Sequence, residues 1–282
     1  MTSRTAGAAP DSNLRAAELP PGSLRVLQIT DTHLFANPVG TLLGVNTLES
    51  FRLVVEYFRA HHWSPDLLLA TGDLVHDASP EGYRNLAQML SSFGVPVFSL
   101  PGNHDVPAVM HEHLCGAGIS TDPVMDFGDW RFVMLDSVIA GEEGGRLAPD
   151  QLVQLERALA SSNRHTLVCM HHQPVSVGSA WIDTMAIENP EPFFEIIDRH
   201  DHVRGILWGH VHQTFESVRG AIRLMASPST CVQFAPCIDE FQIDREPPGF
   251  RLLALLPDGT IRSEVVRIAD IPQGLELASS GY

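Results

Sequence analysis

The stretch VPVFSLPGNHD, residues 95–105, places a short apolar run directly before a polar cluster. The same order recurs at four other places: LRVLQIT before Asp-Thr-His, LLLAT before Gly-Asp, TLVCM before His-His, and VRGILW before Gly-His-Val-His. Each apolar run has the length and composition of a buried strand. Because the carboxyl ends of strands in an open α/β sheet converge on one crevice, the sequence predicts that all five clusters meet in one place.

The pattern around these runs alternates strands with amphipathic helices, which indicates an α/β fold. Strands are expected at 24–30, 67–71, 95–100, 132–135, 166–170 and 203–208. One helix is expected to start near Thr47, which is the candidate N-cap, and two further helices are expected over about 82–90 and 151–160. The apolar runs 250–256 and 261–268, on either side of Pro-Asp-Gly, predict a C-terminal hairpin.

Length and composition allow one main domain. A chain of 282 residues with 44% hydrophobic content can bury a sizeable core. Residues 1–22 are rich in Ala, Pro and Ser and are expected to be a disordered tail, so the domain covers 23–282 and ends in a β extension. No run approaches the roughly 20 apolar residues that cross a bilayer. We therefore expect a soluble chain with no membrane partner, and the cytoplasm as its compartment.

The charge and the basic residues of the chain limit the classes of partner and of chemistry that it could have. The formal net charge is −16 and all 18 basic residues are Arg, since the sequence contains no lysine. An acidic surface disfavours nucleic acid, and the absence of lysine excludes Walker-type and Schiff-base chemistry. A protein of this kind would handle phosphate most simply through bound cations. The cysteines are expected to be free and mostly buried thiols, with a zinc or redox role for Cys231 and Cys237 left open.

The five polar clusters form one coherent donor set. Carboxylate, imidazole and carboxamide groups suit iron, manganese or zinc better than calcium, and a shared carboxylate can bridge two ions. The glycines beside the clusters fit a backbone that turns sharply and approaches a metal closely. Asp-x-His and His-x-His are expected to be extended, so that residues i and i+2 share a face. Each cluster alone is weak evidence, but five in this order favour a dinuclear metal site.

The ordered motifs D-x-H, G-D, G-N-H-D, H and G-H-x-H resemble those of the calcineurin-like metallophosphoesterases. The resemblance implies a two-sheet β-sandwich flanked by helices and two divalent or trivalent metal ions, with iron as first choice and manganese or zinc as alternatives. His171 is preferred over His172 because related chains use the first His of such a pair. By resemblance, the ligands are Asp31, His33 and His212 for the first metal, Asn103, His171 and His210 for the second, and Asp73 as the bridge.

Later segments are similar to those of the bacterial class III 3′,5′-cyclic-AMP phosphodiesterases of the CpdA type. They include HHQP at 171–174, GSAWID at 178–183, PSTCVQF at 228–234 and the terminal SGY. This resemblance implies hydrolysis of cyclic AMP to 5′-AMP through attack by a metal-bridging hydroxide. His104 would be the general acid and Asn103 would help to hold the phosphate. The substrate site would comprise His33, Asp73, Asn103, His104 and His212.

Several alternatives stay open at this stage. A glycerophosphodiesterase or a broad phosphodiesterase would share the same seven ligands, and a non-catalytic scaffold would show lost ligands, of which there are none. The segment 173–189 is a candidate for shaping the nucleoside pocket, and Phe234 either stacks on the base or packs in the core. Some relatives carry Asp where His76 stands, so Asp77, Asp105 or neither orients His104. The oligomeric state is not predicted.

Overall fold

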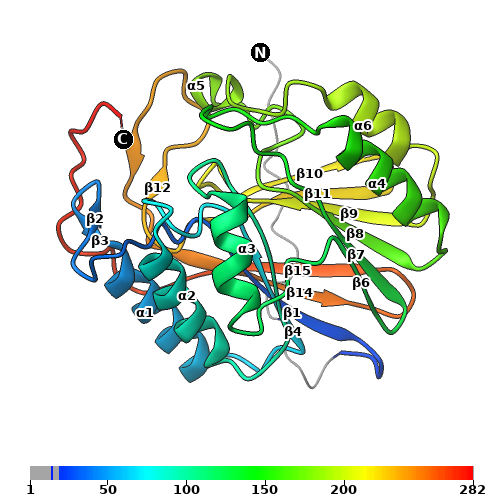
Figure 1. Cartoon of the computed structure of the whole chain (residues 1–282), viewed down its shortest axis with the longest axis horizontal. Coiled ribbons are helices and arrows are strands. Elements are labelled where there is room, and N and C mark those ends of the chain that lie inside the picture. Colours follow the sequence, from blue (N-terminus) through cyan, green and yellow to red (C-terminus); the bar gives the residue numbers. More distant parts are fainter. Residues whose placement is uncertain (1–13, 15–18, 282) are drawn as a thin grey trace, which may run out of the picture.

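The computed structural model describes residues 14 and 19–281 and contains two large β-sheets with helices on their outer sides (Figure 1). The 5-stranded sheet has the order β15-β14-β1-β4-β5, and the 6-stranded sheet has the order β10-β11-β9-β8-β7-β6. The strands of the first sheet are β1 (Leu24–Ile29), β4 (Leu67–Thr71), β5 (Val97–Leu100), β14 (Gly249–Leu255) and β15 (Ile261–Arg267). Those of the second are β6 (Val124–Phe127), β7 (Trp130–Met134), β8 (His165–Cys169), β9 (Val203–Trp208), β10 (Phe215–Arg219) and β11 (Ile222–Ala226). The predicted two-sheet α/β sandwich is confirmed.

The two sheets share a central core because successive side chains of a strand point to opposite faces. In β4, Leu67 and Leu69 pack in the central cluster with Leu167 and Leu207 of the second sheet, whereas Leu68 and Ala70 pack outward against helices. Both faces of these strands are thus buried. This burial explains why these strands appear in the sequence as continuous apolar runs rather than as alternating apolar and polar residues.

Helices cover the outer face of each sheet. α1 (Thr47–His61), α2 (Pro80–Ser91) and α3 (Pro107–Cys115) pack on the first sheet, where Phe51, Leu86 and Leu114 join Leu68 in one cluster. α4 (Pro149–Ala160) and α6 (Pro190–Ile197) pack on the second sheet. The short helix α5 (Ala180–Asp183) lies in the loop between β8 and α6. None of the helices within the described residues is long and apolar enough to cross a membrane.

The predicted helices exist, with small differences at their starts. α1 begins at Thr47, but its cap is Asn46, whose Oδ1 accepts a hydrogen bond from the Glu49 amide at 2.8 Å. The predicted N-cap, Thr47, is therefore one residue beyond the observed one. α2 begins at Pro80, two residues before the predicted range, because Ser79 caps it through Oγ and Pro80 suits the first helical position.

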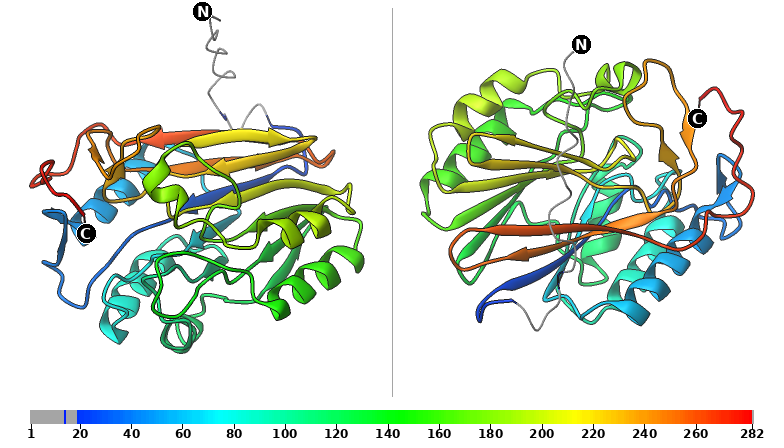
Figure 2. Two further views of the ribbon diagram at one scale, coloured as in Figure 1. Left: turned by 90° about the horizontal axis from the view of Figure 1, so that it is seen from above. Right: turned by 180° about the vertical axis from the view of Figure 1, so that it is seen from behind.

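The C-terminal hairpin is confirmed and belongs to the first sheet, since β14 pairs antiparallel with both β15 and β1. Two further pairs of short strands complete the fold: β2 (Thr41–Leu42) with β3 (Val45–Asn46), and β12 (Gln233–Phe234) with β13 (Ile243–Asp244). The last residues lie beside the β2–β3 hairpin (Figures 1 and 2), where the Glu276 amide donates to Leu43 O at 3.0 Å.

The division into a tail at 1–22 and a domain at 23–282 stays a prediction. Residues 1–13 and 15–18 lie outside the described residues. Leu14 is described, and its carbonyl accepts a hydrogen bond from Trp63 Nε1 at 2.6 Å while its amide donates to Glu264 Oε2 at 3.2 Å. At this one residue of the predicted tail the chain therefore contacts the body of the fold.

Candidate metal centre

The five polar clusters do meet, at the edge of the sandwich where the parallel strands of both sheets end. β1, β4 and β5 run parallel to one another, and so do β8 and β9 in the second sheet. Residues that follow these strands converge there and are almost fully buried. Asp31, His33, His171 and His212 have 0% exposure, Asp73 has 1% and His210 has 2%, whereas Asn103 is half-buried.

The backbone at this edge differs from the extended form that the sequence analysis expects. Asp31, His33, Asp73, His210 and His212 all have a positive φ, between 44° and 64°. Such left-handed conformations cost of order 1–3 kcal/mol per residue outside glycine and persist only where the surrounding structure enforces them. The expectation of extended Asp-x-His and His-x-His segments is therefore wrong. Both members of each pair turn inward through left-handed backbone instead.

Two glycines permit the close approach of these loops. A Cβ atom at Gly102 would lie 2.2 Å from Asp73 Oδ1, and one at Gly209 would lie 2.0 Å from Thr30 Oγ1 and 2.7 Å from Asp31 Oδ2. No side chain fits in those positions. The predicted role of the flanking glycines, close packing around the donor atoms, is confirmed at both places.

One group of donor atoms lies around Asp31, His33 and His212. His33 Nε2 is 3.2 Å from His212 Nε2, and His212 Nε2 is 3.4 Å from Asp31 Oδ1. Asp73 Oδ2 lies 3.7 Å from His33 Nε2. Nitrogen and oxygen atoms at such separations are close enough to surround one ion.

A second group shares the Asp73 carboxylate. His171 Nε2 lies 3.3 Å from Asp73 Oδ2, and the His171 and His210 rings have centroids 5.1 Å apart. His210 Nδ1 lies 3.1 Å from Asn103 Oδ1, which adds the carboxamide to this group. Asp73 is thus placed between the two groups, as a bridging carboxylate must be.

Hydrogen bonds on the outer side orient the imidazole rings. His171 Nδ1 donates to Thr71 O at 2.9 Å and His212 Nδ1 donates to Val232 O at 2.8 Å, which leaves the Nε2 lone pair of each ring pointing inward. Within the described residues, His171 Nε2 is buried without a hydrogen-bond partner, whereas His210 faces its group through Nδ1, 3.1 Å from Asn103 Oδ1. A buried nitrogen oriented like His171 Nε2 fits a metal ion.

The neighbouring His172 is engaged on both ring nitrogens. Its Nδ1 pairs with Ser137 Oγ at 2.8 Å and its Nε2 donates to Glu143 O at 3.2 Å. Although the His172 ring lies close to His171 and His210, these bonds favour His171 as the donor to an ion. Burial, with the nearby His171, lowers the pKa of His172 to about 3, so its ring is neutral.

The buried carboxylates at the centre would be stabilised by a bound positive charge. Burial raises the pKa of Asp73, but His171, His104 and His33 outweigh it and hold that pKa well below its usual value. Burial lowers the pKa of His171, yet the carboxylates of Asp73 and Asp31 raise it to about 9. Burial holds the pKa of His33 and of His210 well below the usual value. Buried carboxylates beside the neutral imidazoles of His33 and His210 are the environment that a metal ion stabilises, and such an ion would take the place of the proton that the carboxylates hold on His171.

The acidic residues near His104 hold the backbone. Asp105 is buried and accepts hydrogen bonds from the Leu74, Val75 and Gly102 amides and from Tyr83 Oη. Asp77 accepts from the Ala36 amide and from Ser79. Both carboxylates therefore support loops, whereas the neighbour stacked on the His104 ring is His76. From the sequence, His76 is only a departure from relatives, because a single His has no periodicity that would reveal its contacts.

A cavity of about 260 Å³ opens beside the donor atoms. Its lining comes from Asn103, His104 and His210 at the centre, from Trp181 and Met185 around α5, and from Glu143, Phe241, Ser280 and Gly281. Trp181 and Met185 belong to the segment 173–189, so part of that segment lines this cavity, while its role in a nucleoside pocket stays a prediction. Phe234 is buried and stacks on the His212 ring, with centroids 4.3 Å apart, so it packs in the core behind a predicted ligand and does not line the cavity.

Comparison with known proteins now adds to this geometry. A model of the calcineurin-like phosphoesterase family matches residues 24–214, which include every donor described above. The chain belongs to the calcineurin-like phosphoesterase family. Its fold matches the crystal structure of a dimetal phosphatase from Danio rerio, with a TM-score of 0.58, 15% identity, and coverage of 87% of this chain and 99% of that one.

Relatives within the phosphoesterase family are much more similar in sequence. The chain is 43% identical to the 3′,5′-cyclic adenosine monophosphate phosphodiesterase CpdA of Vibrio vulnificus over 92% of this chain and 96% of the relative. It is 43% identical to the CpdA of Escherichia coli K12, over 92% and 95% of the two chains. The CpdA of Pseudomonas aeruginosa is 39% identical, over 92% and 96%.

Proposed function

We propose that this protein hydrolyses 3′,5′-cyclic AMP to 5′-AMP at a centre of two metal ions. The observation that carries the proposal is the meeting of a complete set of oxygen and nitrogen donors, nearly all buried and shared through Asp73, beside a cavity of about 260 Å³. Relatives at 43% identity that carry the name of a cyclic-AMP phosphodiesterase support the choice of substrate.

Iron is the proposed metal, with manganese or zinc as alternatives, because the donor set is rich in imidazole. When bound, two such cations acidify a water molecule and neutralise charge on the phosphoryl oxygens. We assign Asp31, His33 and His212 to the first ion, Asn103, His171 and His210 to the second, and Asp73 to both.

The remaining steps, protonation of the leaving oxygen and binding of the phosphate, are assigned to side chains of the protein. Water adds to phosphorus, the bond from phosphorus to the ribose 3′ oxygen breaks, and the departing oxygen needs a proton. His104 lines the cavity beside Asn103 and is the proposed donor of that proton. Asn103 directs its Oδ1 toward the metal side, so its amide nitrogen is available to a phosphoryl oxygen. His33, Asp73 and His212 face the same phosphate from the centre.

The rest of the cavity is the proposed nucleoside site. Trp181, Met185 and Phe241 offer apolar surface to a base, and Glu143 also lines this cavity. A carboxylate placed beside position 6 of the base would accept a hydrogen bond from the exocyclic amine of adenine and would repel the 6-carbonyl oxygen of guanine. In that orientation of the base, this difference favours adenine over guanine.

The four cysteines are free thiols as predicted, although only Cys169 and Cys231 are buried while Cys115 and Cys237 are exposed. Free thiols are the state kept in a reducing compartment such as the cytoplasm, and we place the enzyme there. The ion-holding groups found within the described residues consist of Asp and His, with no cysteine, so the zinc alternative for Cys231 and Cys237 gains no support.

A turnover assay tests the proposal. The purified protein is given cyclic AMP, cyclic GMP and a glycerophosphodiester, and the products are separated by chromatography. We expect the highest kcat/KM for cyclic AMP and 5′-AMP as the product. Faster turnover of the glycerophosphodiester would point to a broad phosphodiesterase, and 3′-AMP as product would contradict the proton donor at the 3′ oxygen.

A further inference from the structure

His76 connects two residues of the proposed mechanism. It lies in the loop between β4 and α2, three residues after Asp73, and it is half-buried. Its amide donates to Leu34 O at 2.8 Å, and the adjacent Leu34 and Val75 form a parallel bridge. The backbone of His76 is therefore fixed against the segment that carries His33, whatever the side chain is.

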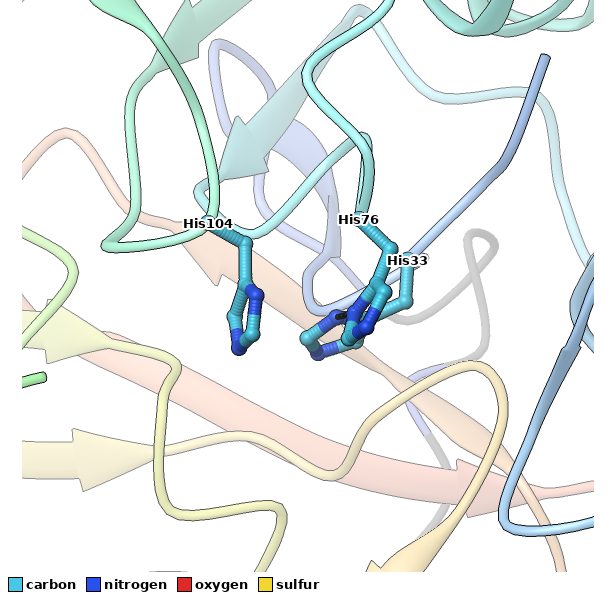
Figure 3. A group of neighbouring side chains, drawn as sticks. All are labelled: His33, His76 and His104. Carbon is cyan, nitrogen blue, oxygen red and sulfur yellow. Dashed lines mark hydrogen bonds between the residues drawn. The ribbon is translucent and has the colours of Figure 1, made fainter. Parts of the chain in front are cut away.

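The His76 side chain touches His33 through a nitrogen and His104 through its face (Figure 3). The two Nδ1 atoms of His33 and His76 are 3.1 Å apart. The rings of His76 and His104 are stacked, with centroids 4.5 Å apart and an angle of 23° between their planes. Phe35 packs against His76 with a centroid distance of 4.9 Å. The His76 ring is thus held by Phe35 and His104 together.

The contact between the two Nδ1 atoms has a consequence for the metal ligand. A hydrogen bond between them requires one N–H and one lone pair. His171 and His212 donate Nδ1–H to backbone carbonyls, so that Nε2 carries the lone pair. If His33 follows the same arrangement, its Nδ1–H donates to the bare Nδ1 of His76 and its Nε2 lone pair faces Asp73 and His212.

A third metal ion among these three rings is disfavoured by their geometry. Nitrogens of His33, His76 and His104 come within 4.8 Å of one another, close enough to raise this alternative. The lone pair of an imidazole nitrogen lies in the ring plane, however, and the planes of His76 and His104 are nearly parallel and stacked. Two stacked rings do not direct their lone pairs at one point. The contact fits support of the two residues better than ligation.

We propose that His76 is a positioning residue with two separable functions: its Nδ1 fixes the orientation of His33 toward the first metal, and its ring face fixes the orientation of His104 for proton donation. The inference rests on the proposed function for the His104 half. The His33 half concerns metal binding and can be tested without any substrate.

Three variants of the full chain separate the two functions. In His76→Asn, the side-chain Oδ1 can take the place of Nδ1 as acceptor, while the ring is lost. In His76→Phe, the aromatic face remains and the acceptor is lost. His76→Ala removes both. His61, an exposed histidine on α1 that stacks on Tyr57, provides the matched controls His61→Asn and His61→Phe.

The first measurement is the affinity for zinc by competition with a chelator, together with the number of ions bound. His76→Phe and His76→Ala should bind the first ion about 10- to 100-fold more weakly, the cost typical of a lost partner of a metal-bound histidine. His76→Asn should stay within about threefold of the wild-type protein. The wild-type protein should bind two ions. A third ion that disappears in His76→Phe would overturn the proposal and make the cluster a metal site.

The second measurement is kcat and KM for cyclic AMP and for bis-p-nitrophenyl phosphate with both metal sites saturated. His76→Asn should lower kcat for cyclic AMP by roughly 10- to 100-fold, as displacement of a catalytic group does, with KM nearly unchanged. The loss on the nitrophenyl diester should be clearly smaller. His76→Phe should behave like the wild-type protein here.

The outcomes distinguish this inference from the proposed function. If His76→Asn and His76→Phe have equal effects in both measurements, His76 does not have two separable functions. If His76→Phe binds zinc as tightly as the wild-type protein, His76 does not orient His33. If the wild-type protein fails to hydrolyse cyclic AMP, the proposed function fails, while the zinc measurement still decides the contact with His33. Circular dichroism and thermal unfolding verify that each variant is folded.

Discussion

Replacement of His104 by alanine separates proton donation from metal binding. The substitution removes the imidazole from the cavity but keeps the backbone amide, which donates to Asp73 Oδ1 at 2.9 Å. The support for the proposed bridging carboxylate therefore survives, and the variant should retain two metal ions. The His104 ring is stacked on His76 and lies edge-on to His33 of the first donor group, with centroids 4.5 Å and 4.9 Å apart.

The expected size of the effect follows from the leaving group. A positioned general acid contributes about 10²- to 10⁴-fold, so His104→Ala should slow cyclic-AMP hydrolysis by that factor, or about 2.7–5.5 kcal/mol of transition-state stabilisation. A nitrophenolate departs without protonation, so bis-p-nitrophenyl phosphate should lose much less. The ratio of the two losses, measured as kcat/KM with metal content determined on the same samples, reports the proton donation alone.

Two results would refute this account of His104. Equal losses on both substrates, with both metals retained, would mean that His104 holds the phosphate rather than protonating the leaving oxygen. Loss of a metal ion would make it a ligand or the support of one. Ring strain in cyclic AMP assists departure and reduces the contrast, so the ratio is required only to exceed experimental error clearly.

Three further predictions concern the centre and the cavity. Asp73→Ala should lower the metal content below about one ion per chain, because the carboxylate lies between both groups, while Asp122→Ala, an exposed acid, should keep two ions by elemental analysis. The pKa of His171 lies at about 9 because Asp73 and Asp31 are close, so metal binding to the metal-free protein should release about one proton at pH 7 and none above pH 10. Calorimetry in buffers of different ionisation enthalpy measures the number of protons released. A proton count that does not depend on pH would contradict the prediction. Glu143→Gln should reduce the preference for cyclic AMP over cyclic GMP by about tenfold, the lower end for a hydrogen bond to a charged group, and an unchanged ratio would remove Glu143 from the base site.

Most of the strands could be predicted because burial on both faces produces a continuous apolar run, but β6 and β11 were not predicted. β4 and β9 coincide with their predicted ranges, and β1 differs by one residue. The edge strand β10 was not predicted, since most of its residues are exposed and show no apolar run. α3 was also missed, because it buries only Met110 and Leu114 and therefore carries no apolar stripe.

The donor residues were predictable as a group, but their backbone was not. Five polar clusters after five apolar runs indicate one edge of a sheet, and that edge exists. The left-handed backbone at Asp31, His33 and Asp73 is not encoded by local preference. It is imposed by contacts between distant segments, such as the Asp31 amide bonded to Gly72 O and the His33 amide bonded to Asp73 O. The same limitation hid the pairing of His33 with His76.

Metal analysis of the purified chain combined with cyclic-AMP hydrolysis tests the central claim most directly. We predict about two ions per chain, iron or manganese in the natural state, with activity that disappears on complete chelation. Activity should return with iron or manganese better than with magnesium, because imidazole donors disfavour a hard octahedral ion. A chain that binds no metal, or that recovers equally well with magnesium alone, or that hydrolyses no cyclic AMP when fully loaded, would contradict the account.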